Sequence, residues 1–298
     1  MQMKLAGTVD VPDLLPGRII TLPGRGEVFV RHHVHHDESR ATVLLLHGWT
    51  ASSDLQFFTA YGALSREFSV IGIDHRGHGR GLRPNRPFSL EDCADDAAAV
   101  VRALGVPKVV TVGYSMGGPI SLLFWKQHSD LVGAMVFQAT ALEWHSSSSE
   151  RVRWKIGRVL SPIFRRATTP RTLRYMVRRL IRRGHEMHRY VPWMIGELRR
   201  NDPWMVSEAG RAISRFDARP FAPGISVPTT MVLTTRDKLV PPAKQRALAE
   251  AVKAEVVELE GDHFAPLVQP REFSDVTLRA VDLAARRAGQ GPSAPERQ

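Results

Sequence analysis

This sequence of 298 residues has little cysteine and no long apolar run. Cys93 is its single cysteine, so the chain can form no internal disulfide and offers no cysteine pair for a zinc or thiol-redox site. No stretch approaches the ~18 uninterrupted apolar residues of a membrane-spanning helix. The N-terminal segment contains Asp10 and Asp13 and lacks the apolar segment of a secretion signal. We therefore expect a protein of the cytoplasm that is neither secreted nor membrane-spanning.

The positive charge of the chain is concentrated in one segment. The formal net charge is +11, yet residues 145–222 hold 18 Arg and Lys against 6 Asp and Glu, and the rest holds 23 basic and 24 acidic residues. A charge excess confined to one segment belongs to a structural element and not to the whole fold. Composition therefore gives no general indication of nucleic-acid binding.

Apolar segments with the length of strands alternate with helical patterns on both sides of residues 144–222. Such alternation is typical of a parallel sheet covered on both faces by helices. We expect one α/β domain from residues 1–143 and 223–288, a basic helical insert at 144–222 and a disordered tail at 289–298. The expected strands are residues 17–22, 27–34, 42–46, 69–74, 109–112, 132–138, 229–234 and 255–260. The expected helices are residues 116–128, 242–253 and 272–287, and one that follows Ser89 as N-cap, with Asp92 at the reciprocal capping position.

Ser115 is a candidate nucleophile because of its place in the run Gly-Tyr-Ser-Met-Gly-Gly, directly after an apolar strand. A strand that turns at once into a helix strains the residue at the turn, and Gly113 and Gly117 let the backbone pass closely on either side. The hydroxyl would then stand clear of the turn. An isolated serine is a weak nucleophile and needs a base that is itself held by an acid.

Further polar residues follow other predicted strands. His47-Gly48-Trp49 ends an early strand, Asp237 follows residues 229–235, and His263 follows residues 255–260. The order Ser, Asp, His, together with the His-Gly-Trp segment, resembles the α/β-hydrolase superfamily, in particular its capped lipase and esterase branch. The resemblance implies a mostly parallel twisted sheet flanked by helices, with a helical cap inserted after the sixth strand.

The resemblance also implies a role for each of these residues. His263 would accept the proton of Ser115, and Asp237 would orient the imidazole. The backbone amides of Trp49 and Met116 would form the oxyanion hole, and Gly48, Gly113 and Gly117 would shape the turns. No metal and no organic cofactor is implied.

Several alternatives stay open for these residues. Asp237 could merely cap the helix that starts near Pro241, and Glu143 is the second choice for the acid because some members of the superfamily place it there. Asp262 is a poor substitute because it neighbours His263 in the chain. The Asp-His-Arg-Gly-His-Gly segment that starts at Asp74 is expected to order a loop, with its histidines structural.

The expected function is hydrolysis of carboxylic esters through an acyl-enzyme on Ser115. The substrate would be a small-molecule or lipid ester with an apolar acyl group, or a thioester. A serine here, where epoxide hydrolases of the superfamily use aspartate, favours acyl chemistry. The same residues would also suit a cofactor-free perhydrolase of the haloperoxidase type, a carbon-carbon bond hydrolase or an acyltransferase. A non-catalytic lipid-binding protein is the alternative from another class.

Residues 169–184 have the pattern of a basic amphipathic helix. Thr169 and Pro170 suit its N-terminus, and Gly184 suits its end. An apolar stripe comprises Leu173, Met176, Val177, Leu180 and Ile181. The opposite side carries Arg171, Arg174, Arg178, Arg179, Arg182 and Arg183.

Three interpretations of this helix are possible. The stripe can pack on the domain and leave the arginines solvated, or the helix can bind an anionic membrane surface, such as the inner face of the cell membrane. Nucleic-acid binding is the third and least favoured, because the aromatic residues form no stacking module. Those aromatic residues are expected to line an apolar acyl pocket: Trp154, Tyr175, Tyr190, Trp193 and Trp204.

Overall fold

The structure is a computed structural model that describes residues 9–145, 152, 156, 169–181 and 184–289. Except for Gly289, the predicted tail lies outside the described residues. Arg182, Arg183 and Trp154 lie outside them too. The division into a core domain and an insert stays a prediction, so residues 144–222 are called the insert by their place in the chain.

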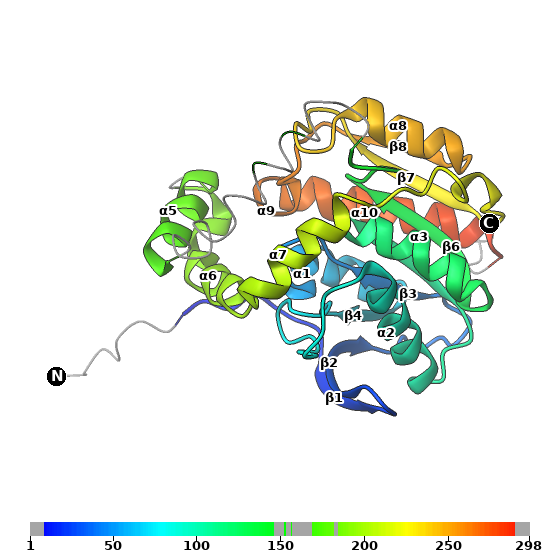
Figure 1. The fold of residues 1–298 in the computed structure, drawn as a ribbon, viewed down its shortest axis with the longest axis horizontal. Coiled ribbons are helices and arrows are strands. Elements are labelled where there is room, and N and C mark those ends of the chain that lie inside the picture. Colours follow the sequence, from blue (N-terminus) through cyan, green and yellow to red (C-terminus); the bar gives the residue numbers. More distant parts are fainter. Residues whose placement is uncertain (1–8, 146–151, 153–155, 157–168, 182–183, 290–298) are drawn as a thin grey trace, which may run out of the picture.

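A single sheet of eight strands forms the centre of the molecule, in the order β1-β2-β4-β3-β5-β6-β7-β8 (Figure 1). The pairs β1–β2 and β2–β4 are antiparallel, and every other pair is parallel. The predicted mostly parallel sheet is thus confirmed. The strands are β1 Gly17–Leu22, β2 Gly26–His33, β3 Thr42–Leu46, β4 Ser69–Ile73, β5 Val109–Tyr114, β6 Val132–Gln138, β7 Thr229–Thr234 and β8 Glu255–Leu259.

Helices cover both faces of the sheet. Along β3, Leu44 and Leu46 pack into one apolar core, and Val43 and Leu45 into another on the opposite face. Successive side chains of a strand point to opposite faces of the sheet. Because both faces are buried here, the central strands have continuous apolar sequences. The first core includes side chains of α2 Leu90–Ala103, α3 Gly117–Gln127 and α8 Pro242–Ala251, and the second those of α1 Ser53–Ser65 and α10 Pro270–Arg287.

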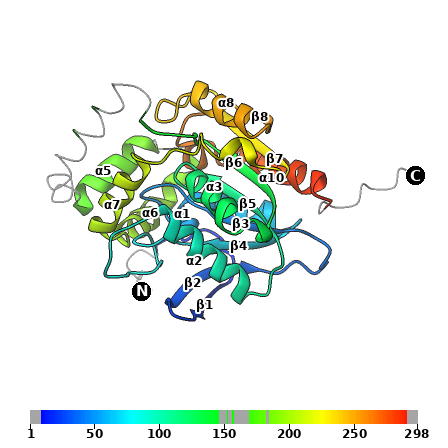
Figure 2. The ribbon, with the colours of Figure 1, turned by 45° about the vertical axis from the view of Figure 1, so that its right-hand side comes forward.

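Three α-helices with both ends among the described residues lie in the insert, between β6 and β7. They are α5 Pro170–Leu180, α6 Val191–Arg199 and α7 Pro203–Ile213, and Figures 1 and 2 both show them grouped at one end of the sheet. Shorter helices are η1 Ser129–Leu131, η2 Glu186–Tyr190, η3 Ala222–Gly224 and α9 Ala265–Val268. Within the residues described, no helix is both long and apolar enough to cross a membrane.

A local signal in the sequence locates the start of α2. Ser89 accepts a hydrogen bond from the backbone N–H of Asp92, as predicted for the N-cap of α2. The prediction of a reciprocal cap from the Asp92 side chain is wrong, because this carboxylate forms ion pairs with Arg76 and Arg86. Cys93 is buried in α2, where burial raises the pKa of its thiol and keeps it protonated.

Candidate active site

Ser115 lies at the sharp turn between β5 and α3, in a strained backbone conformation. Its φ is 51°, in the left-handed region that residues other than glycine rarely adopt. A Cβ at Gly117 would overlap the carbonyl oxygen of Leu46, so glycine is required for this close approach. The backbone N–H of Ser115 donates to Gln138 at 2.9 Å, and its carbonyl accepts from the Thr140 hydroxyl at 2.8 Å. Contacts with β6 and the loop after it therefore hold the strained turn.

The side chains of Ser115, His263 and Asp237 form a continuous hydrogen-bonded chain. Nε2 of His263 lies 3.0 Å from Oγ of Ser115, and Nδ1 lies 2.7 Å from Oδ2 of Asp237. With Nδ1 protonated and donating to the carboxylate, Nε2 is the acceptor for the serine proton. In the chain, His263 is 148 positions from Ser115 and 26 positions from Asp237. The fold brings the three residues together at the carboxyl ends of three parallel strands.

Asp237 is held in place from both of its oxygens. Oδ1 accepts hydrogen bonds from the backbone N–H groups of Leu239 at 2.8 Å and Val240 at 2.9 Å. Oδ2, which faces His263, also accepts from the Thr234 hydroxyl at 3.1 Å. The aspartate organises its own loop and contacts the histidine. The helix-capping alternative is wrong, because the N-cap residue of α8 is Pro241 and no side chain caps that helix end.

Gln245 on α8 supports Asp237 from behind and was not found by sequence reasoning. It is fully buried, and its Nε2 donates to the Thr234 hydroxyl and to the carbonyl of Val240, both at 2.8 Å. Its Oε1 accepts from the N–H of Thr234 at 3.0 Å. Gln245 therefore fixes Thr234 and Val240, two of the residues that bind Asp237. No local motif marks a glutamine eight positions after the aspartate, which only the fold brings back to it.

Tyr114 is a second positioning residue that the sequence did not reveal. Its hydroxyl donates to the backbone carbonyl of His263 at 2.9 Å, and its ring meets the imidazole edge-on at a centroid distance of 5.5 Å. Burial and the nearby charges of Asp237 and Asp262 raise the pKa of Tyr114, so its hydroxyl remains a donor. The residue before the candidate nucleophile thus holds the backbone of the candidate base.

The two alternative acids are engaged elsewhere. Glu143 pairs with the ammonium of Lys244 at 2.9 Å and accepts from the N–H of His145 at 2.8 Å. Asp262 accepts from the N–H of Phe264 at 2.8 Å, at the entrance to α9. Asp237 is accordingly the carboxylate that contacts His263.

The His47-Gly48-Trp49 loop passes directly beside the candidate nucleophile. A Cβ on Gly48 would lie 3.3 Å from Cβ of Ser115, which places this loop in contact with the turn. The indole of Trp49 donates to the carbonyl of Val206 on α7 at 2.8 Å. Met116 is the N-cap residue of α3, where backbone amides point out of the helix. The oxyanion-hole role of the Trp49 and Met116 amides stays a prediction that this arrangement permits.

The loop after β4 is ordered by a buried carboxylate. Asp74 accepts from the backbone N–H groups of Ser53 and Arg80, both at 2.7 Å. The rings of His75 and His78 lie 4.2 Å and 5.5 Å from that of His47, and all three are buried. None of these histidines contacts Ser115. In the described part of the chain, no group of three His, Cys, Asp or Glu side chains could hold a metal ion.

The described aromatic residues of the insert do not form one pocket. Tyr190 and Trp193 pack edge-on against Phe58 of α1, with ring centroids 6.0 Å and 5.0 Å away. Tyr175 is exposed, and Trp204 is partly exposed at the start of α7. The rings of Tyr190 and Trp193 thus anchor the insert to the core, and the acyl pocket stays a prediction for these two residues.

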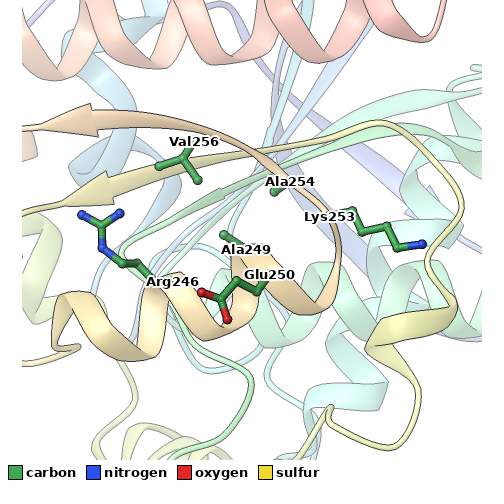
Figure 3. A pocket seen from close by; sticks show the side chains of 6 residues that line it. All are labelled: Arg246, Ala249, Glu250, Lys253, Ala254 and Val256. Atoms are coloured by element: carbon green, nitrogen blue, oxygen red, sulfur yellow. The ribbon is translucent and has the colours of Figure 1, made fainter.

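Two surface hollows lie away from the catalytic candidates. One, of about 330 Å³, is the α8–β8 hollow; Figure 3 shows its lining, which is Arg246, Ala249, Glu250, Lys253, Ala254 and Val256. The other, of about 370 Å³, is the α5–α6 hollow, lined by Arg174, Arg178, Val191, Pro192, Ile195, Gly196 and Arg199. Neither hollow includes Ser115, Asp237 or His263.

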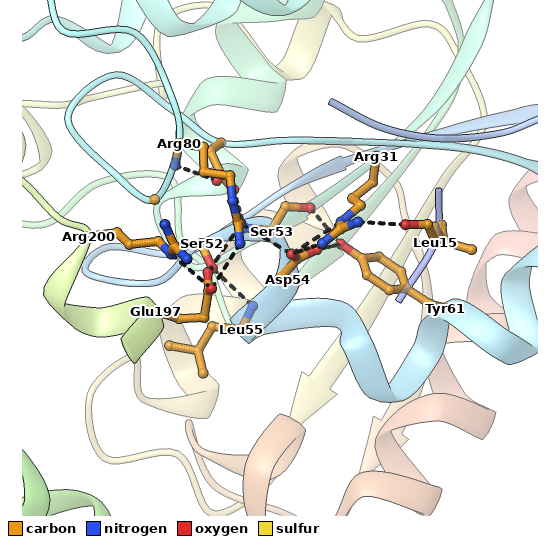
Figure 4. Close-up of polar contacts among 12 residues, drawn as sticks. Leu15, Arg31, Ser52, Ser53, Asp54, Leu55, Tyr61, Arg80, Glu197 and Arg200 are labelled. Carbon is orange, nitrogen blue, oxygen red and sulfur yellow. Dashed lines mark hydrogen bonds and ion pairs between the residues drawn. The ribbon is translucent and has the colours of Figure 1, made fainter. Parts of the chain in front are cut away.

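A buried polar network joins the insert to the core (Figure 4). Glu197 of α6 is only 2% exposed, and its carboxylate binds Arg80 at 3.1 Å and the Ser52 hydroxyl at 3.1 Å. Arg80 in turn reaches Asp54 at 3.3 Å, and Asp54 pairs with Arg31 at 2.7 Å. Because buried charges must be paired, this network fixes the position of α6 over α1.

Comparison with known proteins agrees with the architecture. The AB hydrolase superfamily protein YisY of Bacillus subtilis is 23% identical over 220 residues, which cover 71% of this chain and 80% of that protein. An enol-lactonase structure from Burkholderia xenovorans has a TM-score of 0.74 at 23% identity, covering 89% of this chain and 99% of that one. An esterase structure from Exiguobacterium antarcticum has a TM-score of 0.75 at 19% identity, with the same coverage of 89% and 99%. At these identities the solved structures establish the fold alone.

The sequence model of a family described as alpha/beta hydrolase fold matches residues 41–270, a range that contains Ser115, Asp237 and His263. The match spans most of the chain, and the sheet order and helix layers are those described above. The chain belongs to the alpha/beta hydrolase fold family.

Proposed function

We propose that this protein hydrolyses carboxylic esters through an acyl-enzyme on Ser115. The observation that carries the proposal is the unbroken contact from Asp237 through His263 to Ser115, at 2.7 Å and 3.0 Å. A serine is a competent nucleophile only with such a base and orienting acid. The contact places Nε2 of His263 within hydrogen-bond reach of the serine proton that it would accept.

The reaction follows from these contacts. Oγ of Ser115 attacks the ester carbonyl carbon while Nε2 of His263 takes its proton, and Asp237 stabilises the resulting imidazolium. The amides of Trp49 and Met116 bind the negative carbonyl oxygen of the tetrahedral intermediate. When the C–O bond breaks, His263 returns the proton to the departing alkoxide, which leaves as an alcohol.

The second half of the reaction regenerates the serine. Nε2 of His263 takes a proton from water, whose oxygen attacks the acyl carbon and forms a second tetrahedral intermediate. Its collapse breaks the bond to Oγ of Ser115, which recovers the proton from His263. The products are one carboxylic acid and one alcohol.

An apolar acyl group is the substrate feature that we propose. Three large apolar side chains are exposed on the loops that carry the reacting groups: Trp49 at 38%, Leu239 at 50% and Phe264 at 42%. Trp49 is itself an oxyanion candidate, Phe264 follows His263, and Leu239 lies two residues after Asp237, so all three lie on loops at the ends of β3, β7 and β8. Exposed apolar side chains are favourable contacts for an apolar ligand. The two similar solved structures are those of an esterase and an enol-lactonase, which agrees with ester cleavage because a lactone is a cyclic ester.

Hydrolysis of p-nitrophenyl esters of increasing acyl length tests this function. We expect turnover that rises from acetate to a medium-chain ester, and labelling of the protein by a fluorophosphonate probe. Ser115→Ala should abolish both. Labelling that persists in this variant would overturn the role of Ser115, and turnover of no ester together with no labelling would favour the non-catalytic binding protein.

A further inference from the structure

The two surface hollows differ in how their basic side chains are neutralised. In the α8–β8 hollow, Arg246 pairs with Glu258 at 2.8 Å, and the carboxylate of Glu250 is part of the lining (Figure 3). In the α5–α6 hollow, three arginines and no acidic residue form the lining. The similar size of the hollows makes this difference of charge the feature that distinguishes them.

The arginines of the α5–α6 hollow come from two helices and converge on an apolar floor. Arg174 and Arg178 extend from α5 and Arg199 from α6, and none of the three forms an ion pair with any residue that the structure describes. Val191 and Ile195, between them, are buried. Because these guanidinium groups have no counter-ion among the described residues, their charge is available to an external anion.

The helices around the hollow add positive charge and almost no negative charge. The α5 sequence PRTLRYMVRRL has four arginines and no acidic residue. The α6 sequence has a single acid, Glu197, and this carboxylate is buried against Arg80 and Ser52 (Figure 4). The positive charge on the outer surface of both helices therefore remains unneutralised by the residues that the structure describes.

Two exposed apolar side chains lie among these arginines. Tyr175 and Met176 are each 65% exposed, between Arg174 and Arg178 in the chain. Val177 and Ile181 of the same helix are buried against the protein, so the apolar stripe is divided between the core and the surface. The helix consequently presents arginines together with one aromatic and one flexible apolar side chain to the outside.

We propose that the α5–α6 hollow and the exposed side of α5 bind the phosphate headgroups of an anionic phospholipid bilayer. The arginine fork matches phosphate oxygens with two parallel hydrogen bonds, and Tyr175 and Met176 reach the interfacial layer. The buried part of the stripe keeps the helix on the membrane surface instead of within it. A membrane fits better than nucleic acid because exposed Met has no role in binding phosphodiester backbone, whereas it is stabilised at a lipid interface.

Vesicle co-sedimentation tests the proposal with the full-length protein. Vesicles of phosphatidylcholine alone are compared with vesicles that contain added phosphatidylglycerol, at low and high NaCl. The key variant combines Arg174→Gln, Arg178→Gln and Arg199→Gln. Arg246→Gln, in the other hollow, is the matched control because it removes an arginine whose charge is already paired. Thermal unfolding and p-nitrophenyl ester turnover of each variant show that it is folded.

We expect binding to the anionic vesicles alone, weakened by salt. Three arginines near an anionic leaflet predict a loss of about 100-fold in vesicle affinity for the triple variant at low salt, and no loss for Arg246→Gln. Equal binding to both vesicle types, binding to neither, or full binding by the triple variant would overturn the proposal. Binding to a DNA duplex without binding to vesicles would also overturn it. So would displacement from vesicles by millimolar inorganic phosphate, if NaCl needs a tenfold higher concentration for the same displacement, because that would identify a free-anion site.

Discussion

The side-chain amide of Asn201, in the insert, donates a hydrogen bond to the backbone carbonyl of Thr50 at 2.6 Å. Thr50 has φ 65° and follows Trp49 in a turn closed by a hydrogen bond from Ala51 to Gly48 at 3.3 Å. Such a turn favours glycine at the position of Thr50, and a positive φ at a β-branched residue costs on the order of 1–3 kcal/mol of strain. The other end of Asn201 accepts from the N–H of Gly79 at 2.9 Å. The insert therefore holds a strained backbone directly beside the candidate oxyanion amide.

Removal of this contact should impair the chemical step more than substrate binding. For Asn201→Ala we expect kcat for a p-nitrophenyl ester to fall about tenfold to 100-fold with KM nearly unchanged, because the Trp49 amide loses its fixed position. The added change Thr50→Gly should restore much of the activity, since glycine adopts a positive φ without strain. A change confined to KM, or no rescue in the double variant, would contradict this positioning role.

The identity of the acid can be tested by a matched pair of carboxylate substitutions. Asp237→Asn should lower kcat by about 10³- to 10⁴-fold, because an amide favours the wrong tautomer of His263. Glu143→Gln should leave kcat within a few fold, since that carboxylate binds Lys244. Steady-state kinetics on the two purified variants decide the matter, and the opposite ranking would return the role to Glu143.

The predicted and missed features of the molecule differ in the range over which their signals act. Strands such as β3 and β5, the Ser89 cap and the positions of Ser115, Asp237 and His263 at strand ends follow from local patterns, since each is encoded within a few residues. Helix α1 was missed because ten of its thirteen residues are buried, from Ser53 to Leu64, and it has no polar face to give a helical period. The supports from Tyr114, Gln245 and Asn201 depend on contacts that only the tertiary fold creates.

The network around Glu197 should contribute strongly to stability. Glu197→Ala leaves Arg80 with Asp54 as its remaining partner, and the loss of the hydrogen bonds from Arg80 and Ser52 should cost about 1–3 kcal/mol. Glu208→Ala on α7 is the control: Glu208 pairs with the more exposed Arg211 at 2.6 Å, and such pairs contribute about 0–1 kcal/mol. Urea unfolding at neutral pH measures both. Equal free energies of unfolding for the two variants would show that the network does not anchor the insert.

The three buried histidines predict a loss of stability in mild acid. Burial lowers the pKa of His47 to about 4 and of His78 to about 3, and it also lowers the pKa of His75. In the unfolded chain a histidine has a pKa of about 6.5. Above that pH the rings are neutral in both states and stability is complete. As the pH falls below about 6.5, these histidines bind protons in the unfolded chain but not in the folded protein. The free energy of unfolding therefore decreases toward pH 4.

His75 provides the variant that tests this effect. Neither of its ring nitrogens has a hydrogen-bond partner among the described residues. Its backbone N–H donates to Nε2 of His47 at 2.9 Å, and its backbone carbonyl accepts from the N–H of His78 at 2.9 Å. His75→Leu should therefore keep the fold at pH 7.5 and lessen the loss in acid by up to about 1.4 kcal/mol per pH unit. Urea unfolding at pH 7.5, 6 and 5 gives the comparison. Parallel curves for the two proteins would mean that His75 takes up its proton without unfolding and that the acid sensitivity arises elsewhere.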